Sequence, residues 1–84
     1  MNKILPALLL ILLFALQAFS QHSSVAYRKH GDTQYQHHHY QSAIEFYTKA
    51  LTKSPETGYL MLQLARCYVR TNQPAEAEKW FIQA

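Results

Sequence analysis

The sequence predicts an all-α fold in which antiparallel helical hairpins stack side by side, preceded by a signal peptide. Three observations predict it. The N-terminal segment is apolar with a basic start, whereas the rest of the chain mixes polar and apolar residues. Apolar residues in that remainder recur with the spacing of one helix face and not with the alternation of a strand. Only short breaks separate the helical stretches, and short connections make neighbouring helices antiparallel.

The N-terminal segment has the features of a secretory signal peptide. Lys3 gives a basic start, and residues 4–15 are apolar and uncharged. Ala18 and Ser20 are small residues at the third and first places before a possible cut. A basic start, an apolar stretch and a small-x-small site are typical of a cleaved signal. We therefore expect residues 1–20 to be removed after export.

Two other interpretations of this segment stay open. A membrane anchor needs about 20 apolar residues, and the apolar run at 4–19 is shorter and contains Gln17. A buried core helix is the third interpretation, although the segment shows no amphipathic pattern. After the cut we expect a short polar linker at 21–23.

The remainder divides into four expected helices. Ser54-Pro55-Glu56 reads as an N-cap, a proline at the first helical position and an acid in the first turn. Asn72-Gln73-Pro74 is a second break, and the histidine tract His37–His39 fills the third gap. The expected helices are at about 24–37, 40–53, 56–71 and 74–84.

The chain matches itself under one fixed shift along the sequence. This shift aligns Ala43 with Ala77, Tyr47 with Phe81, and Ala50 with Ala84. It equals the period of the tetratricopeptide repeat, a helix–turn–helix unit of about 34 residues. The sequence resembles that family over residues 24–84, with a first repeat at 24–57 and a truncated second repeat at 58–84. The resemblance implies a short α-solenoid.

The residues that carry the resemblance are small residues, where helices approach closely, and aromatic residues, which fill the gap to the next hairpin. Three positions depart from the family pattern: His30, Gln34 and Met61. The alternative is an ordinary helical hairpin with accidental periodicity. The expected repeat-packing residues are Tyr27, Gly31, Ala43, Tyr47, Ala50 and Pro55 in the first repeat, and Leu64, Ala65, Tyr68, Ala77, Phe81 and Ala84 in the second.

The resemblance also implies a binding groove. In this family the first helix of each pair lines a groove that holds an extended peptide or a helix of a partner. Here that surface is mildly basic with aromatic and aliphatic spots, which suits an acidic or C-terminal peptide held by arginine forks. The alternative is a solvated helix face. The expected groove residues are Arg28, Asp32, Tyr35, Tyr59, Leu62, Arg66, Val69 and Arg70.

The histidine tract and the single cysteine are weaker candidates for chemistry. His37, His38 and His39 can bind Zn²⁺ or Cu²⁺ as neutral imidazoles. Adjacent side chains diverge, however, and no Cys, Asp or Glu lies beside them at ligand spacing. We expect a polar turn and no cofactor, with a secreted metal-binding module as the alternative. Cys67 lies on an apolar stripe, which predicts a buried and unreactive thiol.

No catalytic arrangement or phosphate-binding loop can be recognised, so we expect a non-catalytic scaffold that binds a protein or peptide. The net charge of +3 is too small to indicate nucleic acid. The order of signal and repeat resembles the start of bacterial envelope proteins that end in an OmpA-type domain, which implies the periplasm or the outer membrane. A membrane-anchored scaffold is the alternative. Because Trp80 and Phe81 have no covering helix in the sequence, we expect the chain to be an N-terminal fragment of a longer protein, with a partner chain over these residues as the alternative.

Overall fold

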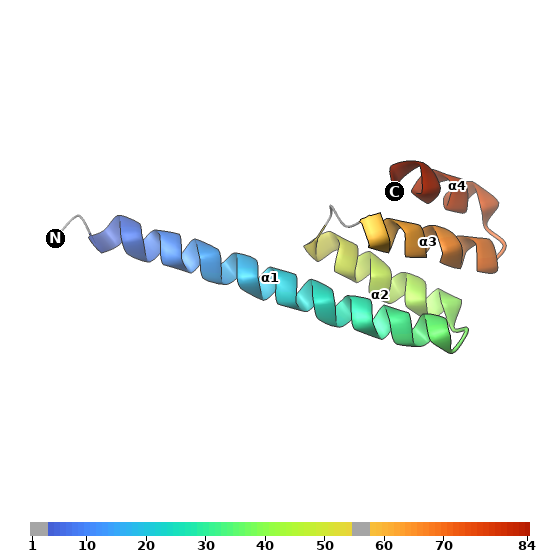
Figure 1. Ribbon diagram of the computed structural model, residues 1–84, viewed down its shortest axis with the longest axis horizontal. Helices are drawn as coiled ribbons and strands as arrows, with labels where there is room; N and C mark the ends of the chain where they lie inside the picture. Colours follow the sequence, from blue (N-terminus) through green and yellow to red (C-terminus); the bar gives the residue numbers. More distant parts are fainter. Residues whose placement is uncertain (1–3, 55–57) are drawn as a thin grey trace.

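The computed structural model describes residues 4–54 and 58–84, and within the first helix it describes the side chains of residues 6–13 and 23–36. These parts of the chain form four α-helices and no strand. In Figure 1, α2 packs along the C-terminal half of α1, α3 lies on α2, and α4 lies on α3. Two antiparallel hairpins therefore stack side by side, which confirms the predicted fold class. The helices are α1 (Ile4–Gln36), α2 (Tyr40–Lys53), α3 (Gly58–Arg70) and α4 (Pro74–Gln83).

The first helix is much longer than predicted. It runs without interruption from Ile4 to Gln36 and extends beyond the stacked hairpins (Figure 1). The helix start that we predicted at residue 24 is wrong, and the polar joint at 21–23 is helical. The physical reason is that residues 7–30 contain neither glycine nor proline, so nothing in this stretch breaks the backbone hydrogen bonds. Cleavage after Ser20 stays a prediction.

The turns that end α1 and α3 have the same geometry. His38 and Asn72 both adopt the left-handed conformation, with φ of 62° and 59°. In each turn the following residue closes the helix, because the His39 amide donates to Gln34 O and the Gln73 amide donates to Tyr68 O. This pattern satisfies carbonyl groups that a helix end leaves unpaired. The shift that matches the two repeats also aligns His38 with Asn72, so the repeat extends to the backbone.

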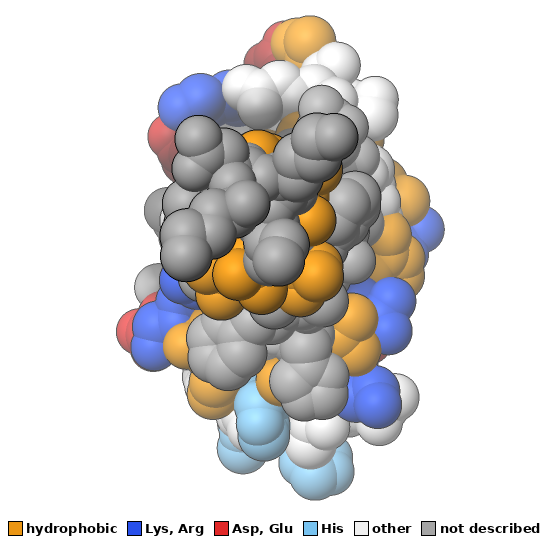
Figure 2. Space-filling view, turned by 90° about the vertical axis from the view of Figure 1, so that its left-hand side faces the viewer, with side chains coloured by type: hydrophobic (Ala, Val, Ile, Leu, Met, Phe, Trp, Pro, Cys, Tyr) orange, Lys and Arg blue, Asp and Glu red, His pale blue; other side chains and the backbone are white. Residues whose placement is uncertain are grey.

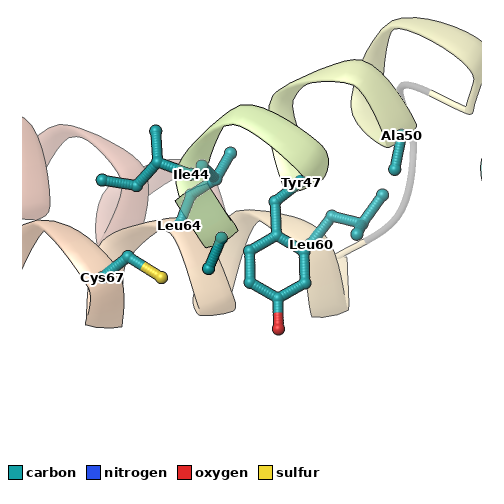
Figure 3. Close-up of a cluster of buried hydrophobic side chains, with 7 residues drawn as sticks. Ile44, Tyr47, Ala50, Leu60, Leu64 and Cys67 are labelled. Carbon is teal, nitrogen blue, oxygen red and sulfur yellow. The ribbon is translucent and has the colours of Figure 1, made fainter. Parts of the chain in front are cut away.

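The core lies between α2 and α3, where the side chains of the two helices interdigitate (Figure 3). Tyr47 and Leu64 are fully buried at its centre. Burial of one such side chain contributes about 1.5–3 kcal/mol. On the α1 side, Ser24 Oγ donates to Ala50 O at 3.0 Å and ties α1 to the end of α2. The core consists of Ala43, Ile44, Tyr47, Ala50, Leu60, Leu64 and Cys67.

Gly31 is required by close packing. The ring of Tyr47 lies directly on this part of α1, and a Cβ atom at Gly31 would be 2.7 Å from Tyr47 Cδ1 and Cε1. Carbon atoms do not approach so closely without displacement. The prediction that a small residue is needed here for helix contact therefore has a direct structural basis.

The second repeat is less covered than the first. Tyr47 and Ala50 are fully buried, whereas their counterparts Phe81 and Ala84 are exposed, Phe81 by 45%. Phe81 and Ala84 are less buried than their counterparts because no described helix lies on the outer side of α4. Trp80 is half-buried against the core.

The other predicted packing positions are buried or half-buried: Tyr27, Gly31 and Ala43 in the first repeat, and Leu64, Ala65, Tyr68 and Ala77 in the second. His30, which departs from the family pattern, stacks on Phe46 with ring centroids 5.3 Å apart. The expected residues Pro55 and Glu56 lie outside the described residues.

The two ends of the stack differ in polarity. On α3, one row of side chains is buried against α2. The residues at the equivalent positions of α1, one repeat earlier in the sequence, are exposed and largely polar. At the other end, α4 and Val69 of α3 border a hollow of about 390 Å³ that is lined mainly by apolar side chains. The buried row on α3 is Leu60, Gln63, Leu64 and Cys67, and the equivalent residues on α1 are Ala26, Lys29, His30 and Thr33. The hollow is lined by Val69, Pro74, Ala77, Glu78, Phe81 and Ile82.

The N-terminal part of α1 extends beyond the stacked hairpins (Figure 1). Its side chains from Leu8 to Leu13 are each more than half exposed. Among the described residues, no helix combines the length and the apolar character needed to cross a membrane.

Candidate functional site

The predicted groove residues all lie on α1 and α3, the first helices of the two repeats. Tyr59, Arg66, Val69 and Arg70 on α3 are exposed. The other four, Arg28, Asp32, Tyr35 and Leu62, are half-buried. The two helices are joined on this face by a hydrogen bond from Tyr59 to Asp32. We call this surface of α1 and α3 the groove face.

Asp32 connects three helices through one oxygen atom. The hydroxyl groups of Tyr47 on α2 and Tyr59 on α3 both donate to Asp32 Oδ1, at 2.6 Å and 2.7 Å. Hydrogen bonds to an ionised carboxylate are stronger than those between neutral groups. The carboxylate therefore links both repeats, a role that its place on the groove face did not indicate.

The hydrogen bonds continue from the core to the surface. Gln63 Nε2 donates to the Tyr47 hydroxyl at 3.2 Å, and the guanidinium of Arg66 donates to Gln63 Oε1 at 2.9 Å. This chain of bonds holds the guanidinium group of Arg66 against Gln63. Beside it, Arg28 Cζ lies 5.9 Å from the centre of the Tyr59 ring, within cation–π distance.

Both phenols in this network hold their protons tightly. Burial raises the pKa of Tyr47 above its ordinary value of 10, and the hydrogen bond to Asp32 raises it further. The same two causes, in the same order, raise the pKa of Tyr59. A neutral phenol is the donor form, so both hydroxyl groups donate to Asp32 throughout the physiological pH range.

Four of the eight predicted groove residues surround one hollow. Tyr35 from the end of α1, and Arg66, Val69 and Arg70 from α3, line it together with Phe81 from α4. Its volume is about 540 Å³, which falls in the range of sites that bind small ligands or side chains. We call it the arginine hollow. Arg28, Asp32, Tyr59 and Leu62 lie on the groove face outside it.

The histidine tract is engaged in the turn between α1 and α2. His38 Nδ1 is 2.8 Å from the Tyr40 hydroxyl, and His39 Nδ1 is 3.2 Å from Gln34 Oε1. The rings of His37 and His39 are 6.3 Å apart, and Figure 2 shows histidine side chains gathered at the lower edge of the molecule. Across residues 4–54 and 58–84, no three His, Cys, Asp or Glu side chains are grouped to hold a metal ion.

Cys67 lies fully buried in the core, where the sequence placed it. Burial raises the pKa of its thiol from an ordinary value of 9 to about 11. The thiolate is the reactive form, so both exclusion of reagent and a high pKa make this cysteine inert.

We expect iodoacetamide at pH 8 to label Cys67 at least about a hundredfold more slowly in the native protein than in urea, because the thiolate fraction falls by that factor when the pKa rises from 9 to 11. Mass spectrometry of timed samples measures both rates. Native labelling within tenfold of the unfolded rate would contradict the buried position.

Comparison with known protein families matches residues 34–84 to the tetratricopeptide repeat. The chain belongs to the tetratricopeptide repeat family. The match spans α2, α3, α4 and the last turn of α1, and the spacing of the left-handed turns at His38 and Asn72 agrees with the period of that repeat. Tetratricopeptide repeats form α-solenoids whose surfaces bind other proteins. Searches of curated proteins and of solved structures find no match.

Proposed function

We propose that this tetratricopeptide repeat protein is a non-catalytic scaffold that binds a protein or peptide partner along its groove face. One observation carries the proposal: the groove face is bridged and fixed by the Asp32 network, yet the side chains of Arg66, Val69 and Arg70 remain exposed on it. A rigid surface with exposed cationic and apolar groups loses little conformational freedom on binding. The two second helices, α2 and α4, support it from behind.

Site-directed photo-crosslinking in the cells that make the protein tests this proposal. A benzophenone amino acid in place of Leu62, on the groove face but outside the arginine hollow, is expected to form one defined protein adduct. The same amino acid in place of Glu45, exposed on α2, is the matched control. Identical adducts at both positions, or none at Leu62, would refute a partner on this face.

We further propose that the scaffold acts in the bacterial cell envelope after export. Support comes from the apolar residues Leu8 to Leu13, which are exposed and contribute nothing to the stacked hairpins, as a removable segment should. The protein recovered from the envelope fraction is expected to begin at Gln21 when its N-terminus is sequenced. An N-terminus at Met1 on membrane-bound protein would indicate the anchored scaffold instead.

A further inference from the structure

We propose that the imidazoles of His37 and His39 together bind a divalent transition-metal ion such as Zn²⁺ in an open, exchangeable site. The site lies in the turn between α1 and α2. None of its residues belongs to the groove face, so this inference does not depend on the proposed function. Three features of the turn lead to it: its fixed backbone, the separation of the two rings, and the proton that Gln34 holds on His39.

The turn fixes the backbone of all three histidines and engages the middle one with Tyr40. The amides of His37, His38 and His39 all donate to carbonyl groups of α1. His38 adopts the left-handed conformation, and its Nδ1 lies 2.8 Å from the Tyr40 hydroxyl oxygen. The two outer histidines are left as a pair on an ordered backbone, so a metal ion does not have to order the turn when it binds.

The rings of His37 and His39 are at a separation that one shared ion allows. A Zn–N bond is about 2.0–2.1 Å long and a ring nitrogen lies about 1.2 Å from the ring centre, so two imidazoles on one ion have centres roughly 4.5–6.5 Å apart. The two ring centroids are 6.3 Å apart. Both side chains are exposed, so an ion can reach them, and rotation of exposed side chains brings a nitrogen of each ring to it.

The third feature is the proton on His39. Its Nδ1 lies 3.2 Å from Gln34 Oε1, and because an amide oxygen only accepts hydrogen bonds, Nδ1 of the neutral ring must carry the proton. Nε2 then has a free lone pair, which is what a metal ion binds. A hydrogen bond from the other ring nitrogen to an oxygen acceptor is the usual support of a histidine ligand. Gln34 therefore prepares His39 for metal binding.

Two imidazoles are fewer protein ligands than a structural zinc site has. The other coordination positions of the ion stay with water, so the ion exchanges and is not a resident cofactor. Neutral nitrogen ligands suit Zn²⁺, Ni²⁺ and Cu²⁺, whereas Mg²⁺ prefers oxygen ligands. The site therefore takes a transition-metal ion and discriminates against Mg²⁺.

The test is a Zn²⁺ titration of the ¹⁵N-labelled protein, prepared without a polyhistidine tag and followed by NMR of the imidazole nitrogens. Before Zn²⁺ is added, His39 is expected to carry its proton on Nδ1. Zn²⁺ is expected to shift the ring signals of His37 and His39 along a one-site curve with a dissociation constant below about 1 mM. Mg²⁺ at the same concentrations should shift neither ring.

Variants separate this site from the general affinity of a histidine tract. His37→Gln and His39→Gln should each weaken Zn²⁺ binding by at least about tenfold, and Gln34→Leu, which changes no histidine, should weaken it by about tenfold. His38→Asn is the matched control. It keeps the turn, because the counterpart Asn72 has the same left-handed conformation, and it should change binding less than about twofold.

Four results would overturn the inference: no shift of the two rings at about 1 mM Zn²⁺, a His39 proton on Nε2, unchanged binding by Gln34→Leu, or equal weakening by His38→Asn and His37→Gln. The last result would mean adventitious binding by any histidine of the tract. Circular dichroism of each variant shows that the helices are intact, so a loss of binding is not a loss of the fold.

Discussion

Replacing Gly31 with alanine is expected to destabilise the fold by about 2 kcal/mol, although alanine is the better helix former by about 1 kcal/mol. The added methyl group would lie 2.7 Å from the Tyr47 ring. That ring is fully buried and its hydroxyl group is bound to Asp32, so it has no space to move away. Thermal unfolding followed by circular dichroism should show a midpoint lower by roughly 10 °C.

The chain contains its own control for this substitution. Gly58 is also in a helix, but a Cβ atom there would meet nothing within 4 Å, so Gly58→Ala should be neutral or slightly stabilising. In a Tyr47→Leu background, which removes the ring, Gly31→Ala should cost less than in the wild type. If Gly31→Ala raises the midpoint, or costs the same in both backgrounds, the close contact is not what requires glycine.

Replacing Asp32 with alanine is expected to cost about 1–3 kcal/mol, because the buried Tyr47 hydroxyl loses its acceptor. Gln63 Nε2 donates to that hydroxyl and cannot take the acceptor's place. Urea denaturation of the wild type and Asp32→Ala measures the difference in the free energy of unfolding.

Two further variants separate this effect from a general loss of charge. Tyr59 is exposed, so Tyr59→Phe should change stability by less than about 0.5 kcal/mol. Asp32→Ala and Tyr47→Phe act on the same bond, and the double variant should lose less than the two single losses combined, by about 1 kcal/mol. Additive losses would mean that the Asp32–Tyr47 bond contributes no stability.

The repeat made most of the fold predictable. The spacing of Ala43, Tyr47 and Ala50, matched by Ala77, Phe81 and Ala84, indicated that α2 and α4 are equivalent helices of two repeats. The close contact at Gly31 followed from the small residue at that position. The turn at Asn72 has a sequence signal as well, because asparagine tolerates the left-handed conformation. Under the shift that aligns the repeats, the same conformation could have been expected at the counterpart of Asn72 in the histidine tract.

The site was only partly predictable. The resemblance to the repeat family placed Tyr35, Arg66, Val69 and Arg70 on one face, but it could not show that Phe81 from α4 completes the arginine hollow. The Asp32 network escaped detection because it joins residues 15 and 27 positions apart. Helical spacing identifies neighbours within one helix, whereas contacts between three helices depend on how they pack. The uninterrupted α1 differs from the predicted start at residue 24 because the polar residues at 21–23 do not end a helix by polarity alone.

The unlike ends of the stack limit how copies of this chain can associate. The outer side of α4 is largely apolar, whereas the matching side of α1 presents Lys29, His30 and Thr33 to solvent. A head-to-tail contact would press the Lys29 charge against this apolar surface, and burying an unpaired charge is costly. Association through the apolar end therefore joins α4 of one copy to α4 of a second copy about a two-fold axis. In such a contact the apolar surfaces of both copies are covered, so no third copy can add there. The asymmetry thus favours assemblies that stop at two copies over open filaments.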